Sequence, residues 1–314
     1  MYRKFWLLSL ALILAACQGL PFSAPTATPT ITPIPTATLT PTPLPTSTPT
    51  PFPEEFTSEA KIGDYQMKIT CKGMGEPTII LENGLDYPSW TMPRFSKISR
   101  TCIYPRVGMG LDRAKGPRTT LDQVNDLHEL LRLTGIPGPY ILVGHSIAGY
   151  NLLLYTHQYP EDVVGLVCVD CRYPIFIDLF IEKLKAAYAD DPDVEAKIHQ
   201  QMIAFYVDEE LPDETLWPNN KEKVDFYKSA IQVREVTSLG DRPFIVLVAD
   251  YTNTAASDEQ IYFNQSWNEG QTLLSQLSTQ GKTQVLYGTT HLSILYHKNV
   301  TEAIQTVYDK VTKP

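Results

Sequence analysis

A run of small residues between two apolar segments constrains this chain more than any other feature. Residues 140–143 are Tyr-Ile-Leu-Val, residues 144–149 are Gly-His-Ser-Ile-Ala-Gly, and an apolar pattern continues to about Tyr159, just before Pro160. The first segment is typical of a buried strand, and the last is typical of a helix that ends at the proline. The pattern therefore predicts a strand, a tight turn at Ser146 and a helix.

The same alternation of strands and helices continues through most of the chain. Strands are predicted at 65–71, 78–81, 101–104, 163–169, 244–249 and 283–286, and helices at 119–133, 258–277 and 300–311. We expect Thr120 and Gln123 to form the capping box of the first helix and Gly135 to end it. Residues 172–240 interrupt the alternation with a long acidic helical pattern, which predicts an inserted helical cap. The fold class is therefore α/β, with a mostly parallel sheet flanked by helices.

The first residues predict an export signal. A basic start at residues 1–4 precedes an apolar run at 5–14, which is shorter than the about 20 residues of a membrane-spanning helix. The ending Leu-Ala-Ala-Cys at 14–17 resembles the lipobox of bacterial lipoproteins. The resemblance implies a signal peptide at 1–16, a lipid on Cys17, and an exported protein anchored at the outer face of a bacterial membrane, at the cell surface or in the periplasm. A plain secretion signal is the alternative.

Residues 17–53 are expected to be a disordered tether rich in threonine and proline. Residues 21–53 hold 11 of the 25 prolines, 11 threonines and no charged residue. Proline removes backbone donors and pushes the preceding residue to extended conformations, so this stretch forms neither helix nor sheet. We expect an extended, polyproline-like spacer.

The charge balance excludes several classes of partner. The chain has 26 basic and 35 acidic residues, and only Arg3 and Lys4 precede residue 54, so residues 54–314 carry 24 basic and 35 acidic residues, a net charge of −11. A nucleic-acid binder needs a basic face to neutralise phosphates, and a membrane-surface module needs basic clusters. Nucleic acid is therefore not an expected partner.

Ser146 is the candidate nucleophile. A serine on a tight strand-to-helix turn has small neighbours, presents its hydroxyl at the sheet edge, and directs the Ile147 N–H toward a developing oxyanion. Its base must be one of six histidines: His128, His145, His157, His199, His291 and His297. Only His291 falls in a loop directly after a late predicted strand, in the chain order expected for a base that follows the serine. His297 is the reserve candidate.

Three segments together resemble the α/β-hydrolase superfamily over nearly all of residues 60–312. They are Thr-Ile-Ile-Leu-Glu-Asn-Gly-Leu at 78–85, Tyr-Pro-Arg-Val-Gly-Met-Gly-Leu-Asp at 104–112 and Gly-Pro-Tyr-Ile-Leu-Val-Gly-His-Ser at 138–146. The resemblance implies one domain over 54–314 with a helical cap at about 172–240, and an oxyanion hole made by the N–H groups of Leu85 and Ile147. Two positions depart from the family pattern: Pro105 replaces an aspartate and Ala148 replaces a glycine.

The acid that would orient His291 is not decided by the sequence. Members of the family place it after the sixth or the seventh strand, where this chain has Asp170 and Asp250. We favour Asp170 and keep Asp250 as the alternative, with Asp258 and Asp178 as further candidates. The carboxylate must hold the imidazole and stabilise its charged form.

Four cysteines remain after Cys17. In the strand order of the family the second and fourth strands are neighbours, and this implies a disulfide between Cys71 and Cys102. Cys168 and Cys171 lie about 10 Å apart in an extended strand, beyond the about 7 Å that a disulfide tolerates, so they pair only if the chain turns between them. The cysteines form one close pair without a second Cys/His pair, which argues against a zinc site.

These features predict an exported, lipid-anchored serine hydrolase without a cofactor or metal. The expected reaction is hydrolysis of a small carboxylic ester through an acyl-enzyme, with Ser146, His291 and Asp170 as the triad. A serine nucleophile disfavours haloalkane dehalogenase and epoxide hydrolase activity. The alternatives are an amidase, peptidase or thioesterase of the same fold, or a non-catalytic binding domain that retains the fold.

Overall fold

The computed structural model describes residues 52–85, 88, 90–198, 221–251 and 257–313. The predicted signal peptide, Cys17 and nearly all of the predicted tether lie outside these residues, as do the middle of the predicted cap and His199. Within the described ranges, every helix is too short or too polar to cross a bilayer.

The described residues form an eight-stranded sheet in the order β1-β2-β4-β3-β5-β6-β7-β8. The strands are β1 (Glu55–Ile62), β2 (Tyr65–Lys72), β3 (Thr78–Glu82), β4 (Thr101–Ile103), β5 (Tyr140–His145), β6 (Val163–Val169), β7 (Phe244–Ala249) and β8 (Gly281–Leu286). The pairs β1–β2 and β2–β4 are antiparallel, and every later pair is parallel. The predicted mostly parallel sheet is confirmed.

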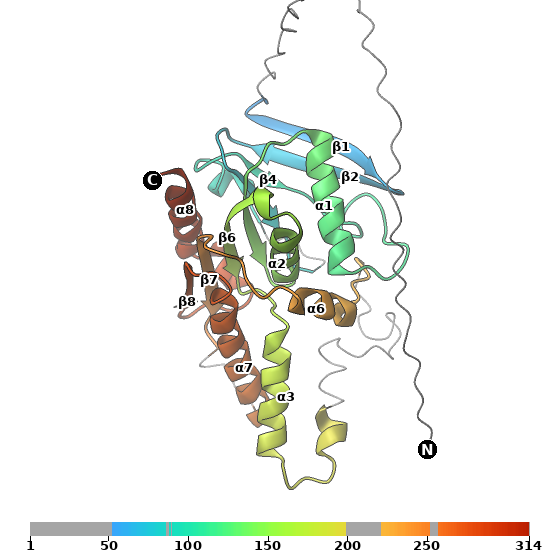
Figure 1. Ribbon diagram of the computed structural model, residues 1–314, viewed down its shortest axis with the longest axis vertical. Coiled ribbons are helices and arrows are strands. Elements are labelled where there is room, and N and C mark those ends of the chain that lie inside the picture. The colour runs from blue at the N-terminus through green and yellow to red at the C-terminus, as the bar shows by residue number, and fades with distance from the viewer. Residues whose placement is uncertain (1–51, 86–87, 89, 199–220, 252–256, 314) are drawn as a thin grey trace, which may run out of the picture. The chain divides into compact units, whose positions relative to one another are not determined.

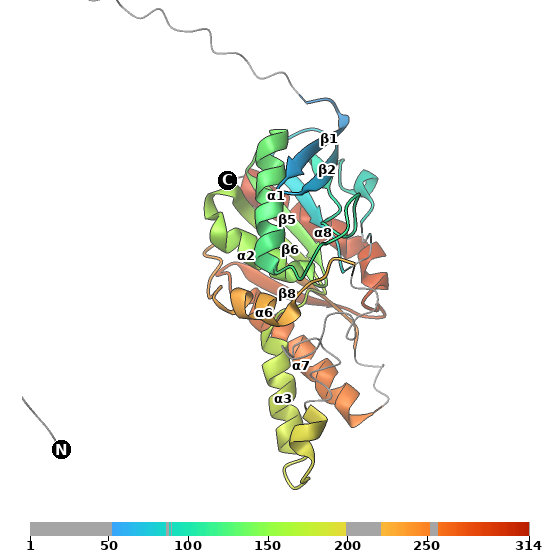
Figure 2. The same ribbon diagram turned by 90° about the vertical axis from the view of Figure 1, so that its right-hand side faces the viewer.

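Helices cover both faces of this sheet (Figures 1 and 2). They are α1 (Thr120–Thr134), α2 (Ala148–Gln158), α3 (Ile175–Ala187), α6 (Phe226–Arg234), α7 (Asp258–Ser275) and α8 (Lys298–Thr312), with short 3-10 helices η1 (Met92–Arg94), η2 (Pro160–Asp162) and η3 (Ser293–Tyr296). One core cluster joins a sheet face to α1, α2, α6 and α7, and a second joins the other face to α8 and the residues flanking η1.

The side chains of each central strand alternate between the two clusters. On β5, Ile141 and Val143 belong to one cluster and Leu142 to the other, because successive side chains of a strand point to opposite faces. Both faces are buried, so the strand is a continuous apolar run, as is typical of a parallel sheet. On α8, the buried residues recur at helical spacing and form one apolar stripe: Val300, Ala303, Ile304 and Val307.

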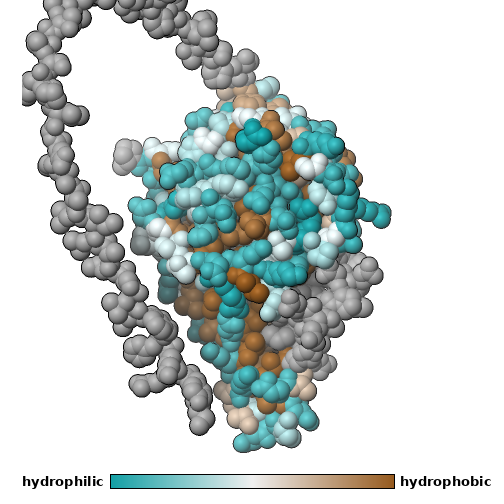
Figure 3. All heavy atoms as spheres, turned by 45° about the vertical axis from the view of Figure 1, so that its right-hand side comes forward, coloured by the Kyte–Doolittle hydropathy of each residue, from teal (hydrophilic) through white to brown (hydrophobic). Residues whose placement is uncertain are grey.

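The described part of the cap region consists chiefly of α3 and α6. Phe180 and Leu184 of α3 form a small third core cluster with Ile198, against which Phe263 of α7 packs. Figure 1 shows α3 projecting away from the sheet beside α7. Figure 3 shows apolar surface on this projecting part, bordered by polar side chains. Phe226 and Val233 of α6 belong to the main core cluster, so α6 is part of the helical layer that covers the sheet.

Two local predictions differ from the structure. Strand β1 was not predicted, because its sequence contains charged residues and few large apolar ones. This composition suits an exposed strand at the edge of a sheet. The capping box of α1 is formed by Thr119 and Asp122 rather than by Thr120 and Gln123. The N-cap is therefore one residue earlier in the chain than we expected. The Gln123 side chain instead donates to the buried Glu222 carboxylate. Gly135 ends the helix with a φ of 67°, as predicted.

Both cysteine pairs form disulfides. Cys71 of β2 lies directly opposite Cys102 of β4, with their Cα atoms 4.0 Å apart. Cys168 and Cys171 are also joined, with their Cα atoms 5.5 Å apart. The second pair is possible because the chain turns at Asp170, where φ is 48°.

The Cys71–Cys102 bridge should stabilise the whole domain. It joins residues 31 positions apart, and the entropy of closing a loop of this length corresponds to about 3–4 kcal/mol. We expect the double variant Cys71→Ala/Cys102→Ala to lose a free energy of unfolding of this order, measured by urea denaturation. An unchanged denaturation midpoint would contradict this account.

Candidate active site

Ser146 occupies a sharp turn between β5 and α2. Its φ is 58°, a left-handed conformation that residues other than glycine rarely adopt and that is typical of a strained functional turn. The turn requires small neighbours: a Cβ on Gly144 would lie 2.8 Å from a Leu152 methyl group, and one on Gly149 would lie 2.5 Å from the Arg172 carbonyl oxygen. Ala148 is the first residue of α2 and is fully buried, so the helix accommodates its methyl group at this position.

The Asp170 carboxylate is fully buried at the end of β6 and accepts four hydrogen bonds. The donors are His291 Nδ1 at 2.6 Å, the Tyr251 hydroxyl at 2.5 Å, Trp267 Nε1 at 3.0 Å and the Ala249 N–H at 3.1 Å. Burial alone would raise the pKa of Asp170, but the hydrogen bond and charge of His291, together with the hydrogen bonds of Tyr251 and Trp267, outweigh it and hold the pKa below its usual value. Asp170 is therefore ionised at neutral pH.

The other candidate acids lie in different environments. The Asp250 carboxylate accepts a hydrogen bond from the N–H of Gly288 at 2.9 Å, in the turn before His291. Asp178 forms an ion pair with Arg234, and Asp258 belongs to the exposed first turn of α7. His291 is thus brought to Asp170 rather than to the alternatives.

His145 connects the His291 loop to the residue before Ser146. Its Nε2 lies 2.8 Å from the carbonyl oxygen of His291, and the two rings are 4.5 Å apart. Burial and the neighbouring His291 lower the pKa of His145 to about 4, so it is neutral at physiological pH and donates through Nε2–H. Among the described residues, no hydrogen bond joins the Ser146 hydroxyl to His291, a bond that is often long before a substrate binds.

A buried arginine holds the backbone that precedes Leu85. The Arg106 guanidinium donates to the carbonyl oxygens of Asn83 at 2.7 Å and Gly84 at 2.9 Å. The same guanidinium binds the carboxylates of Glu82 at 3.1 Å and Glu222 at 2.6 Å. Arg106 thereby connects the end of β3 to the chain that returns from the cap region.

These charges are almost completely shielded from solvent. The side chains of Arg106, Glu82 and Glu222 are at most 2% exposed. Tyr104 donates to Glu82 at 2.6 Å, and Gln123 donates to Glu222 at 3.2 Å. Burial lowers the pKa of Arg106, but Glu222 and Glu82 more than compensate and raise it above its ordinary value. Removing one member would leave an uncompensated buried charge, which costs about 3–5 kcal/mol.

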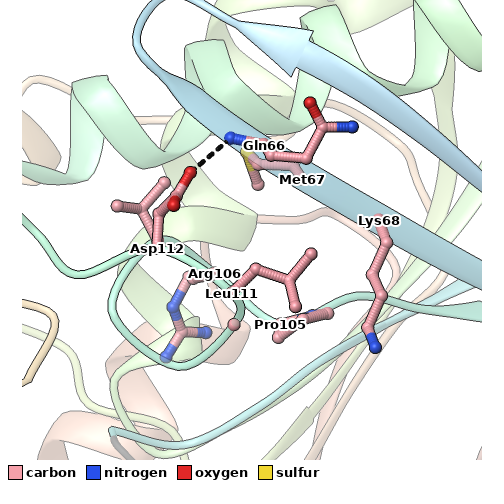
Figure 4. Close-up of a pocket in the computed structure, with 9 residues that line it drawn as sticks. Gln66, Met67, Lys68, Pro105, Arg106, Leu111 and Asp112 are labelled. Atoms are coloured by element: carbon pink, nitrogen blue, oxygen red, sulfur yellow. Dashed lines mark hydrogen bonds between the residues drawn. The ribbon is translucent and has the colours of Figure 1, made fainter.

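A small pocket lies beside the segment that contains Arg106. Its lining comes from β2 and from the loop that follows β4: Gln66, Met67, Lys68, Pro105, Arg106, Val107, Gly110, Leu111 and Asp112. Figure 4 shows these residues, including the hydrogen bond from the Gln66 N–H to Asp112 Oδ2. Ser146, His291 and Asp170 are not part of the lining, so we assign this pocket no role in the reaction.

Sequence reasoning missed several residues of the site. Tyr251 and Trp267 donate to Asp170 from positions far along the chain, and His145 was considered only as a candidate base. Arg106 could have been found, because it lies inside the segment 104–112 that carries the family resemblance. The described residues contain no group of three or more His, Cys, Asp or Glu side chains placed to hold a metal ion.

The fold and the strand-to-helix turn define the class of this protein. Residues 71–297 match the family described as alpha/beta hydrolase fold. The chain therefore belongs to the α/β-hydrolase fold family.

Solved structures share this fold at low sequence identity. A probable hydrolytic enzyme from Pseudomonas aeruginosa has a TM-score of 0.53 and 16% identity, and covers 81% of this chain and 93% of its own. A haloalkane dehalogenase variant from Bradyrhizobium elkanii has a TM-score of 0.52 and 12% identity, covering 82% and 97%. A thermophilic esterase from Thermogutta terrifontis has a TM-score of 0.50 and 18% identity, covering 82% and 99%.

Curated relatives match only part of the chain. The probable transporter efuK of Hormonema carpetanum is 39% identical over 105 residues, which are 31% of this chain and 15% of that protein. The uncharacterized protein YbdG of Bacillus subtilis is 25% identical over 116 residues, 35% of this chain and 36% of that protein. The chain thus spans well under two thirds of the length of these relatives.

Because His145 is neutral in the folded protein, the free energy of unfolding should depend on pH in a predictable way. Between pH about 6.5 and about 4 the unfolded chain carries a proton on His145 that the folded protein does not, so lowering the pH destabilises the fold, by on the order of 3 kcal/mol in total. Burial raises the pKa of Asp126 to about 6, so its protonation acts in the opposite direction over part of this range. We therefore expect the difference in unfolding free energy between wild type and His145→Gln to change with pH.

Denaturant titrations of both proteins at several pH values from 4 to 8 measure this difference. His145→Gln keeps a donor for the His291 carbonyl but cannot titrate. Wild type should lose stability relative to the variant as the pH falls. A constant difference across the range would show that His145 titrates alike in both states.

Proposed function

We propose that this protein is a serine hydrolase that cleaves carboxylic esters with Ser146, His291 and Asp170. The observation that carries the proposal is the 2.6 Å contact between His291 Nδ1 and the carboxylate of the buried, ionised Asp170. The loop that carries His291 is bound through its backbone by His145, the residue that precedes Ser146. An aspartate on Nδ1 orients the imidazole so that its other nitrogen serves as the base. The left-handed turn at Ser146 supports its assignment as the nucleophile.

In the proposed reaction, the Ser146 hydroxyl attacks the ester carbonyl carbon while His291 Nε2 takes its proton. The N–H groups of Leu85 and Ile147 stabilise the oxyanion that forms, and the N-terminus of α2 contributes its positive end. His291 then gives the proton to the departing alcohol and leaves an acyl group on Ser146. A water molecule, activated by the same histidine, releases the acid and restores the enzyme.

Arg106 fits this reaction as a residue that fixes the oxyanion loop. Its hydrogen bonds to the Asn83 and Gly84 carbonyl oxygens restrain the backbone next to Leu85. Oxyanion donors are effective when they are held in place before the reaction begins. The buried carboxylates of Glu82 and Glu222 in turn fix the guanidinium.

An ester is the substrate class that we favour. Serine and histidine of this kind also cleave amides and thioesters, so the bond must be tested directly. The Thermogutta terrifontis structure is described as an esterase and the Bradyrhizobium elkanii structure as a haloalkane dehalogenase, and both share only the fold with this chain. The serine nucleophile proposed here suits acyl transfer.

Substituting the two aspartates separately tests the triad. Asp170→Asn should lower kcat for p-nitrophenyl esters by about 10,000-fold, because the amide favours the wrong imidazole tautomer. Asp250→Asn should keep kcat within a few-fold, because Asp250 bonds to Gly288. The measurement uses the full-length protein with p-nitrophenyl esters of several chain lengths, beside a p-nitroanilide and an acyl thioester.

A fluorophosphonate probe supplies the control for the nucleophile. Wild type should be labelled on Ser146, and Ser146→Ala should be neither labelled nor active. Full turnover of Asp170→Asn together with an inactive Asp250→Asn would reverse our choice of acid. Folded wild-type protein that neither reacts with the probe nor cleaves any of the substrates would favour a non-catalytic binding domain.

We further propose that the enzyme is exported, lipid-anchored through Cys17, and separated from the membrane by a tether at residues 17–53. The Leu-Ala-Ala-Cys ending at 14–17 and the uncharged Thr/Pro-rich stretch support this arrangement. The two disulfides also fit an oxidising compartment outside the cytoplasm. The tether would place an ester hydrolase in front of the outer face of the bacterial membrane, at the cell surface or in the periplasm.

Replacing Cys17 tests the anchor. Wild type expressed in a bacterium should partition into the detergent phase of Triton X-114 and carry a mass increase for a lipid on a chain that begins at Cys17. Two acyl chains are sufficient for stable membrane attachment. Cys17→Ser should appear in the aqueous phase without the lipid mass. Wild type in the aqueous phase with an unmodified Cys17 would contradict the proposal.

A further inference from the structure

The Cys168–Cys171 disulfide closes a ring that contains Asp170 itself. The two Cα atoms are 5.5 Å apart, and Asp170 between them has a φ of 48°. Residues three positions apart in an extended strand lie about 10 Å apart, too far for the about 7 Å limit of a disulfide. The bond therefore requires the chain to turn between the two cysteines, and the left-handed conformation of Asp170 makes that turn.

The same disulfide contacts the turn that carries Ser146. Cys171 Sγ lies 3.5 Å from the Gly144 carbonyl oxygen, and a Cβ on Gly149 would lie 2.7 Å from the Cβ of Cys171. The next residue, Arg172, donates its N–H to the Ser146 carbonyl oxygen at 2.7 Å. The ring is thus packed against the turn that carries the candidate nucleophile, and it contains the candidate acid.

The surroundings of this pair do not fit a thiol-exchange site. Both cysteines are fully buried, whereas a Cys-x-x-Cys pair that exchanges disulfides needs a sulfur that a partner thiolate can reach. The bond also spans only three positions, against 31 for Cys71–Cys102, so loop closure contributes less to global stability. Its main consequence should be local, at Asp170.

We infer that Cys168 and Cys171 are positioning residues whose disulfide keeps Asp170 in the left-handed conformation that directs its carboxylate to His291. The inference rests on the proposed function, because it assigns a task within the triad. The left-handed conformation costs free energy for residues with a side chain, and aspartate, which tolerates it better than most, still favours extended or right-handed conformations. Without the bond, Asp170 can relax toward an extended conformation, and its carboxylate moves away from His291.

Two variants break the bond in different ways. Cys168→Ala/Cys171→Ala removes both sulfurs, and Cys171→Ser replaces one with a hydroxyl of similar size that can donate to the nearby Gly144 carbonyl oxygen. We expect each to lower kcat for p-nitrophenyl esters about 10- to 100-fold with little change in KM, because small displacements of reacting groups cost rate rather than binding. The matched control, Cys71→Ala/Cys102→Ala, should lose stability but keep kcat.

A spectroscopic signal reports on the acid directly. The proton between His291 Nδ1 and Asp170 should give a strongly deshielded resonance in the proton NMR spectrum of wild type in water. We expect this resonance to shift or disappear in both bond-breaking variants and to remain in the Cys71/Cys102 control. Circular dichroism identifies folded protein, and if the double variant does not fold, Cys171→Ser decides the question.

The inference is overturned if a folded variant lacking the Cys168–Cys171 bond keeps either the wild-type kcat or the wild-type resonance. Failure of the proposed function gives a different result: wild type and Ser146→Ala would then have equal esterase rates. In that case the resonance alone still tests whether the disulfide holds Asp170 against His291. A lost resonance in the bond-breaking variants would support the positioning role even without a measured reaction.

Discussion

The buried Asp170 carboxylate is the constraint on which the site depends. An ionised carboxylate without partners would be very costly inside the protein, so its four donors are a condition for the fold rather than an addition to it. They come from the end of β7, from Tyr251 just after it, from Trp267 on α7 and from His291 after β8. Satisfying one charge therefore brings the end of β7, helix α7 and the loop after β8 to the end of β6.

The order of the strands places a second buried charge on the opposite side of Ser146. Strand β5, which leads into Ser146, lies between β3 and β6. The end of β6 carries Asp170, and the end of β3 leads to Leu85 through backbone that Arg106 holds. Ligands of open parallel sheets bind outside the carboxyl ends of such strands. The two buried charge clusters thus fix the backbone on both sides of the candidate nucleophile.

The features that the sequence predicted well are local or follow chain order. The strand-to-helix turn at Ser146 is encoded within ten residues, and the mostly parallel sheet follows from apolar runs alternating with helical patterns. The choice between Asp170 and Asp250 is different, because both follow apolar strands and the loop after β8 decides which of them meets His291. The Cys168–Cys171 pairing depended on a single backbone angle, which apolar periodicity does not report.

That backbone angle explains why an aspartate suits position 170. A glycine would adopt the left-handed conformation more readily but would supply no carboxylate. A glutamate would supply the charge on a longer side chain, whereas aspartate and asparagine are the residues with side chains that best tolerate this conformation. Asparagine would offer the same turn without the negative charge. Aspartate therefore meets both requirements at once. Its left-handed conformation brings Cys171 into contact with the backbone before Ser146, and its carboxylate presents a negative charge to His291.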